Sequence, residues 1–196
     1  GRFSQEIDGK VHEAVARVRV VPGKPGSDVI VSTDMTNERK VSPTAIQAAQ
    51  EGVMEAAQTG VFGFPLSEAE VTLIDLEFPS NRSDLAAKVA ASHAVENACR
   101  NAGIRLLEPV MDVEIVTDPE TVGPMLSDLN AHRAQISGME MEGDLQKIRA
   151  RIPLAETFGD FTTRLRNLTQ GRAAFTMQPA GFAPVSPEQT KRILGL

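Results

Sequence analysis

The order of hydrophobic patterns after residue 105 restricts the fold of this chain more than any other feature of its sequence. Several short segments alternate apolar and polar side chains, as half-buried strands do, and others repeat apolar residues every three or four positions, as helices do. The predicted strands are residues 111–116, 135–142, 147–152 and 172–177; one predicted helix begins at residues 118–120, and the other spans 155–169.

This β-α-β-β-α-β order is typical of the split βαβ or ferredoxin-like fold. The segment Lys147–Ile152 places three apolar side chains on one face of a strand and three basic side chains on the other. Two helices would cover the apolar face of such a sheet. The second face would then stay open to an outside contact.

The first half of the chain, roughly residues 1–105, has an α/β pattern. Ser42 and Pro43 form a helix start, with Ser42 as the N-cap, and Gly60 ends that helix. A second helix is rich in alanine, which would let it lie close against a sheet, and it ends at Gly103. The predicted strands are residues 11–21, 28–33 and 69–78, and the alanine-rich helix spans residues 84–102.

Composition narrows the class of protein. The chain has no Trp or Tyr, so its cores must consist of aliphatic residues, Met and eight Phe. A single cysteine, Cys99, excludes an internal disulfide and fits a reducing compartment. No run of about 18 apolar residues is present to span a membrane. The start Gly-Arg-Phe lacks a Met and a signal pattern, and we interpret the chain as a piece of a longer protein.

Charge is unevenly distributed along the chain. The net charge of −6 argues against a protein that coats nucleic acid with its whole surface. Residues 106–146 carry nine acids and one base, whereas residues 147–172 carry six bases and two acids. The basic segment would suit phosphate, but it would equally suit a solvated face.

No constellation of residues has the pattern of an active site. The three histidines fall on separate predicted elements, and no His or Cys pair has the spacing of metal ligands. Phosphate-binding loops and the nucleophile elbow of hydrolases are also missing from the sequence. The residues alone therefore predict a two-domain binding fragment without a catalytic site, a metal or a cofactor.

Several motifs resemble the two C-terminal domains, IV and V, of elongation factor G. The resemblance covers essentially the whole chain and is strongest after residue 84. Its main points are Leu107-Glu108-Pro109, Pro153-Leu154, Phe158-Gly159, Arg164-Leu165-Arg166 and Gly171-Arg172-Ala173.

The resemblance implies an α+β chain of two domains. Residues 1–105 would form an elongated, ribosomal-protein-like α/β domain, residues 106–185 a ferredoxin-like βαββαβ domain, and residues 186–196 a helical tail. The parent protein would be a GTPase that promotes tRNA–mRNA translocation, and the resemblance favours the cytoplasm over the mitochondrial matrix as its location. GTP and Mg²⁺ would bind to N-terminal domains that lie outside this fragment, so the fragment itself would not be an enzyme.

The resemblance also implies partners and contact residues. The partners would be ribosomal RNA and proteins, tRNA and mRNA near the decoding region, and a ribosome recycling factor, with the chain a monomer that binds no membrane. By this resemblance, two loops, 37–43 and 79–84, would form the tip. Both precede helices, and helix N-termini attract phosphate. Ordinary solvated loop charges, and arginines that only support the fold, are the alternatives. The expected tip contacts are Arg39, Lys40, Ser42, Asn81, Arg82 and Ser83, and the expected RNA-facing residues of the second domain are Arg149, Arg151, Arg164, Arg166 and Arg172.

Two departures from the family pattern leave the role open. The loop at 79–84 is shorter than in typical members and lacks their histidine. The segment Glu6–Ala14 replaces a glycine-rich run, and only His12 aligns with the family motif there. These departures suit a paralogue that splits ribosomes for recycling. A stand-alone RNA-binding or regulatory module with a ferredoxin-like domain is a further alternative.

Overall fold

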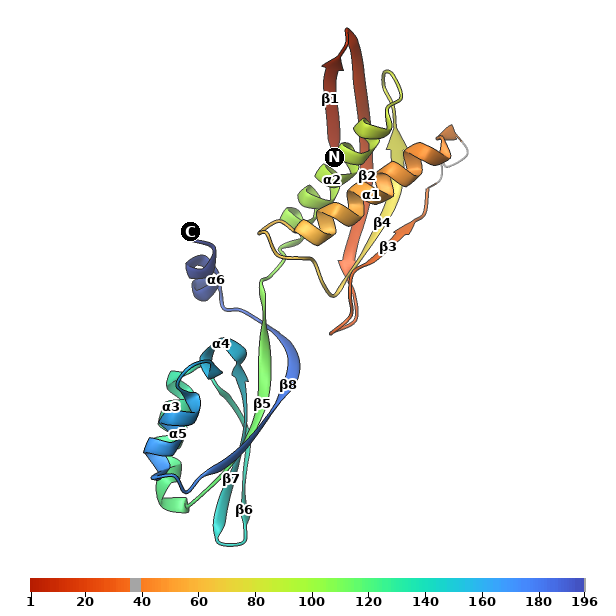
Figure 1. Cartoon of the computed structure of the whole chain (residues 1–196). Helices are drawn as coiled ribbons and strands as arrows, with labels where there is room; N and C mark the ends of the chain where they lie inside the picture. The colour runs from red at the N-terminus through yellow and green to blue at the C-terminus, as the bar shows by residue number, and fades with distance from the viewer. Residues whose placement is uncertain (36–39, 196) are drawn as a thin grey trace. The chain divides into compact units, whose positions relative to one another are not determined.

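A computed structural model describes residues 1–35 and 40–195 of the chain. The described residues form two units, Gly1–Ile104 and Arg105–Leu196, each with its own sheet and hydrophobic core (Figure 1). No helix in the described part of the chain is long and apolar enough to cross a membrane.

The first unit has a four-stranded sheet in the order β1-β2-β4-β3, which places the hairpin of the first two strands at one edge. Only β3 runs parallel to its neighbour β4. The first strand has no counterpart in the sequence analysis, because few of its side chains are apolar. The strands are β1 (Arg2–Ile7), β2 (Lys10–Pro22), β3 (Ile30–Thr33) and β4 (Ala69–Glu77).

Two helices cover one face of this sheet, α1 (Pro43–Thr59) and α2 (Asp84–Ala102) (Figure 1). Both helices were predicted with nearly these bounds, since their caps are local in sequence. Gly60 and Gly103 follow their last residues, as expected. Small residues let the two helices approach closely: a Cβ atom on Gly52 would lie 2.1 Å from the carbonyl oxygen of Lys88. Gly52 thus permits the close approach of the helices, and the alanines fill the core beneath them.

The second unit confirms the predicted βαββαβ order. Its strands are all antiparallel, and their spatial order is β6-β7-β5-β8. Helices α3 and α5 lie on one face of the sheet (Figure 1). The elements are β5 (Leu107–Thr117), α3 (Val122–Ala131), β6 (Gln135–Glu142), β7 (Leu145–Pro153), α4 (Leu154–Thr157), α5 (Phe161–Thr169), β8 (Ala174–Pro184) and α6 (Pro187–Leu194).

Two helix predictions for this unit need correction. The single helix expected at 155–169 is two helices, α4 and α5, because Gly159 between them has a φ of +86°, which a helix does not permit. Phe158 would belong to the apolar stripe of a single helix over 155–169, but it is 71% exposed in this break. The helix expected to begin at Asp118 starts with a 3₁₀ turn at Pro119–Thr121, and the Asp118 side chain makes no capping hydrogen bond.

Candidate functional site

The loop between β4 and α2 is fixed against the β1–β2 hairpin by hydrogen bonds to one carbonyl group. The Ser80 hydroxyl and the Asn81 side-chain amide both donate to the carbonyl oxygen of Val11, at 3.1 and 3.0 Å. Asn81 also forms an isolated parallel bridge with His12. The loop therefore continues the edge of the sheet at this end of the first unit.

A second contact joins this loop to the segment that precedes α1. The Arg82 guanidinium donates a hydrogen bond of 3.1 Å to the carbonyl oxygen of Lys40. The Thr44 hydroxyl donates across the same gap to Asp84, at 3.5 Å. The two loops that the sequence predicted as a tip are thus brought together. Arg39, the remaining predicted tip base, lies outside the described residues.

The predicted tip residues do different things in the structure. The side chains of Ser42 and Ser83 cap α1 and α2, each accepting a hydrogen bond of 3.3 Å from the backbone N–H three residues later. Their hydroxyls are therefore committed to the fold. The exposed side chains of Lys40, Asn81 and Arg82 remain at the surface.

Sequence reasoning missed the part of the β1–β2 hairpin in this site. Val11 contributes only its backbone carbonyl, which no sequence motif reveals. His12 has a buried Nδ1 atom without a hydrogen-bond partner among the described residues. The bridge from His12 to Asn81 places this histidine beside the loop between β4 and α2.

The five arginines expected to face RNA in the second unit do not share a face of its sheet. Ile148, between the neighbouring residues Lys147 and Arg149, is fully buried beneath the helices, so the strand alternation puts Arg149 and Arg151 on the open side of the sheet. Arg164 and Arg166 lie on α5, which covers the opposite side. These arginines therefore lie on both sides of the sheet, and no sequence pattern assigns helix and strand arginines to a common side.

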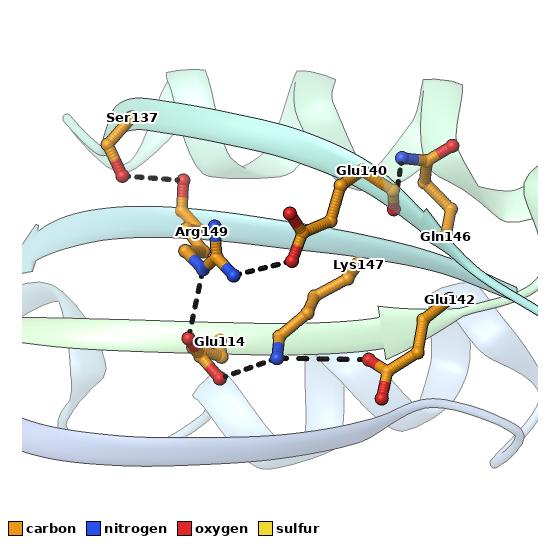
Figure 2. A network of polar contacts seen from close by, with 7 residues as sticks. All are labelled: Glu114, Ser137, Glu140, Glu142, Gln146, Lys147 and Arg149. Atoms are coloured by element: carbon orange, nitrogen blue, oxygen red, sulfur yellow. Dashed lines mark hydrogen bonds and ion pairs between the residues drawn. The ribbon is translucent and has the colours of Figure 1, made fainter.

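The open face of the second unit carries paired charges instead of a basic surface (Figure 2). Glu114 accepts from Arg149 and from Lys147, each at 3.1 Å. Arg149 also bonds to Glu140, and Lys147 lies 3.8 Å from Glu142. These residues come from three adjacent strands, so the acids of the chain's acidic segment neutralise the bases of its basic segment across the sheet.

Most of the other arginines are also paired. Arg151 lies 3.0 Å from Asp112, Arg164 binds both Asp128 and Asp160, and Arg172 lies 2.7 Å from Asp118. Within the described residues Arg166 is the one member of the predicted set without an acidic partner, and it is exposed. Arg166 is therefore the predicted arginine most available to an outside anion.

The charge network on the open face makes a testable contribution to stability. Hydrogen bonds from Lys147 and Arg149 hold the pKa of Glu114 below its ordinary value. A lowered pKa in the folded state stabilises the fold at higher pH, and this stabilisation disappears as pH falls through the folded pKa.

We expect Glu114→Gln to lower the urea midpoint of the second unit at pH 6 and to have progressively less effect below about pH 4. Denaturant titrations of both proteins from pH 3 to pH 7 measure the difference. A difference that is constant across this range would show that the carboxylate charge is irrelevant.

Comparisons with known proteins agree with this architecture. Residues 1–103 match the family described as Elongation factor G, domain IV, and residues 105–193 match the one described as Elongation factor G C-terminus. Elongation factor G 2 of Syntrophomonas wolfei subsp. wolfei (strain DSM 2245B / Goettingen) is 36% identical over 195 residues, which are 98% of this chain and 28% of that protein. A crystal structure from Thermus thermophilus matches with a TM-score of 0.71 and 31% identity, over 99% of this chain and 29% of that one.

The chain spans between a quarter and a third of the length of these relatives. The two family matches together cover nearly all residues of this chain, and so does the alignment with the relative. The boundary between the two family matches coincides with the boundary between the two structural units. This chain therefore belongs to the elongation factor G family and carries that factor's domain IV followed by its C-terminal domain.

Proposed function

We propose that this chain is the ribosome-engaging part of an elongation factor G-like GTPase that promotes GTP-dependent movement of tRNA and mRNA in the cytoplasm. The observation that carries the proposal is the tip of the first unit. The loop between β4 and α2 is bonded there to Lys40, shortly before α1, through Arg82, and to β2 through the Val11 carbonyl.

A tip loop that is fixed to its own domain suits a domain that acts by contacting the ribosome or its ligands. The loop between β4 and α2 is held in place before it meets a partner, so it loses less conformational entropy on binding than a free loop does. The exposed bases Lys40 and Arg82 add attraction to phosphate without reading base sequence. The proposed contacts are therefore with the backbone of tRNA, mRNA or ribosomal RNA near the decoding region.

The second unit would face ribosomal RNA and protein through its helical side. Arg166 is exposed on α5 and has no acidic partner among the described residues, whereas the arginines of the open face are paired with carboxylates. GTP and Mg²⁺ would be bound by other domains of the parent protein. The role of this part would be positioning, without a catalytic step of its own.

The test is a double charge reversal, Lys40→Glu with Arg82→Glu, in the full-length factor. Translocation should slow by about tenfold or more, because one charge-assisted hydrogen bond contributes about 1.5 kcal/mol. Binding of GTP in the absence of ribosomes should not change. Lys24→Glu is a matched control, since Lys24 is an exposed base in the loop that follows the other end of β2.

Ribosome-dependent activity that is equal in the double variant and the control would contradict the tip proposal. The brevity of the loop between Glu77 and Asp84 favours a second candidate, the splitting of post-termination ribosomes together with a recycling factor. Parallel assays of translocation and subunit splitting separate the two. Normal translocation without splitting would exclude the recycling role.

A further inference from the structure

The two edges of the sheet in the second unit differ in their ability to accept another strand. Strand β8 forms one edge, and it contains Pro179 and Pro184, which have no N–H to donate. Strand β6 forms the other edge and contains no proline. Beyond a register shift near its start, β6 pairs without interruption with β7 over Gly138–Glu142. These five residues offer a regular edge of about 16 Å.

The β6 edge strand also exposes apolar side chains on one side. Met139 pairs across the ladder with Ile148, which is fully buried beneath the helices, so Met139 points to the helix-covered face. It is nevertheless 53% exposed, and Met141, two residues on, is 59% exposed. Ile136 is 36% exposed at the start of the strand. The flexible methionines can adapt to different apolar partners.

Among charged residues, the opposite side of the β6 edge carries only acids of its own strand, of which Glu140 is bonded to Arg149 on β7. Glu140 and Glu142 point to the open face, and Asp144 follows in the hairpin turn (Figure 2). The whole hairpin segment from Gln135 to Gln146 contains these three acids and no Lys or Arg. The Glu142 carboxylate is only loosely paired, at 3.8 Å from Lys147, and its side chain is 61% exposed.

We propose that β6 binds an extended segment of another protein by strand addition, and that this segment alternates apolar residues with Lys or Arg. Main-chain hydrogen bonds to the β6 edge would provide the pairing. The apolar side chains of the segment would cover Met139 and Met141, and its basic side chains would lie opposite Glu140 and Glu142.

The acidic residues of β6 restrict the kinds of molecule that could pair with this strand. A second copy of β6 would bring Glu140 and Glu142 close to the same acids and would be repelled. A nucleic acid strand would be repelled for the same reason. A basic, partly apolar protein segment would not be repelled by these acids. The proposal is independent of the translocation proposal, which rests on the first unit and on the helical side of the second.

The probe is a nine-residue peptide of alternating lysine and valine with blocked ends, titrated into the full 196-residue chain. Two-dimensional NMR should show shifts of the backbone amides of residues 138–142, and slower hydrogen exchange of those amides, while β8 stays unchanged. The same peptide with glutamate in place of lysine should bind at least about fivefold more weakly, since each cross-strand pair contributes up to about 1 kcal/mol.

Two variants test the two sides of the edge. Glu142→Lys should weaken binding of the lysine peptide about fivefold, and Met141→Ser should weaken it by a similar factor. Glu6→Lys is the matched charge control, because Glu6 is an exposed acid on β1, one of the two edge strands of the first unit. Phe158→Ser is the matched apolar control, since Phe158 is an exposed apolar residue outside β6, between α4 and α5. Amide spectra that change only around the substituted residue would establish that each variant folds.

Three results would overturn the proposal. The first is the absence of amide shifts in β6 at peptide concentrations up to about 1 mM, a range that covers weak complexes. The second is equal binding of the lysine and glutamate peptides. The third is binding that shifts β8 or β1 instead of β6. None of these results bears on the tip variants Lys40→Glu and Arg82→Glu.

Discussion

Gly52→Ala should destabilise the first unit by about 2 kcal/mol, although alanine is the better helix former. The exchange improves intrinsic helix propensity by about 1 kcal/mol. The added Cβ, however, would lie 2.1 Å from the carbonyl oxygen of Lys88 and 2.8 Å from its carbonyl carbon. These are backbone atoms of α2, which cannot rotate away as a side chain can. The helices must therefore separate, and overpacking of this kind costs about 1–3 kcal/mol or more.

Thermal denaturation of the full chain, with hydrogen exchange to assign each transition to its unit, measures this effect. The melting temperature of the first unit should fall by about 10 °C. Gly123→Ala in α3 is the matched control, because a Cβ atom there would have no neighbour within 4 Å. The control should leave the second unit as stable or slightly more stable. A Gly52→Ala variant as stable as the parent chain would show that α1 and α2 are not held at this distance.

Arg133→Ala should destabilise the second unit by about 2 kcal/mol. The Arg133 guanidinium donates two hydrogen bonds to Glu108, at 2.6 and 3.1 Å, and a third of 2.8 Å to Glu156. It thereby joins the loop after α3 to β5 and α4. Burial lowers the pKa of Arg133, but the hydrogen bonds and charges of the two glutamates outweigh burial and raise it overall. Truncation would leave two largely buried carboxylates without their partner, which costs more than the loss of the pair itself.

The urea midpoint of the second unit, again assigned by hydrogen exchange, measures the loss. Arg149→Ala is the comparison, since Arg149 is 46% exposed and its ion pairs are screened by water. It should cost less than about 1 kcal/mol. The loss of stability in Arg133→Lys should lie between those of Arg133→Ala and Arg149→Ala, because an ammonium group keeps the charge but cannot span both carboxylates. Equal losses for Arg133→Ala and Arg149→Ala would contradict the central role of Arg133.

Local signals in the sequence account for the elements that were predicted correctly. The bounds of α1 follow from Ser42, Pro43 and Gly60, which act on the neighbouring backbone alone. The hairpin of β6 and β7 follows from strict alternation on both sides of a Gly-Asp turn. The division of the predicted helix into α4 and α5 was missed because the apolar spacing continues through Phe158 although the backbone does not.

The candidate site was less predictable, because it depends on which segments meet in space. Sequence reasoning placed Arg82 and Lys40 in the same tip but took both as ligands for phosphate. In the structure Arg82 also binds the backbone of the other loop. The ion pairs on the open face of the second unit were unpredictable for the same reason. The partners of Arg149 depend on the register of the strands, and a shift of one residue would replace all of them. Ion pairs across a sheet cannot be assigned before that register is known.

The loop between β4 and α2 is anchored at both ends on carbonyl oxygens, that of Val11 and that of Lys40. Every amino acid supplies such an oxygen, so the side chains at these two positions are free to vary while the anchors persist. Variants of Lys40 would thus report on what the tip touches, whereas variants of Asn81 and Arg82 would also release the loop. Lys40 attaches the loop through its backbone alone, so substitution of its side chain can alter recognition by the tip while the attachment of the loop is retained.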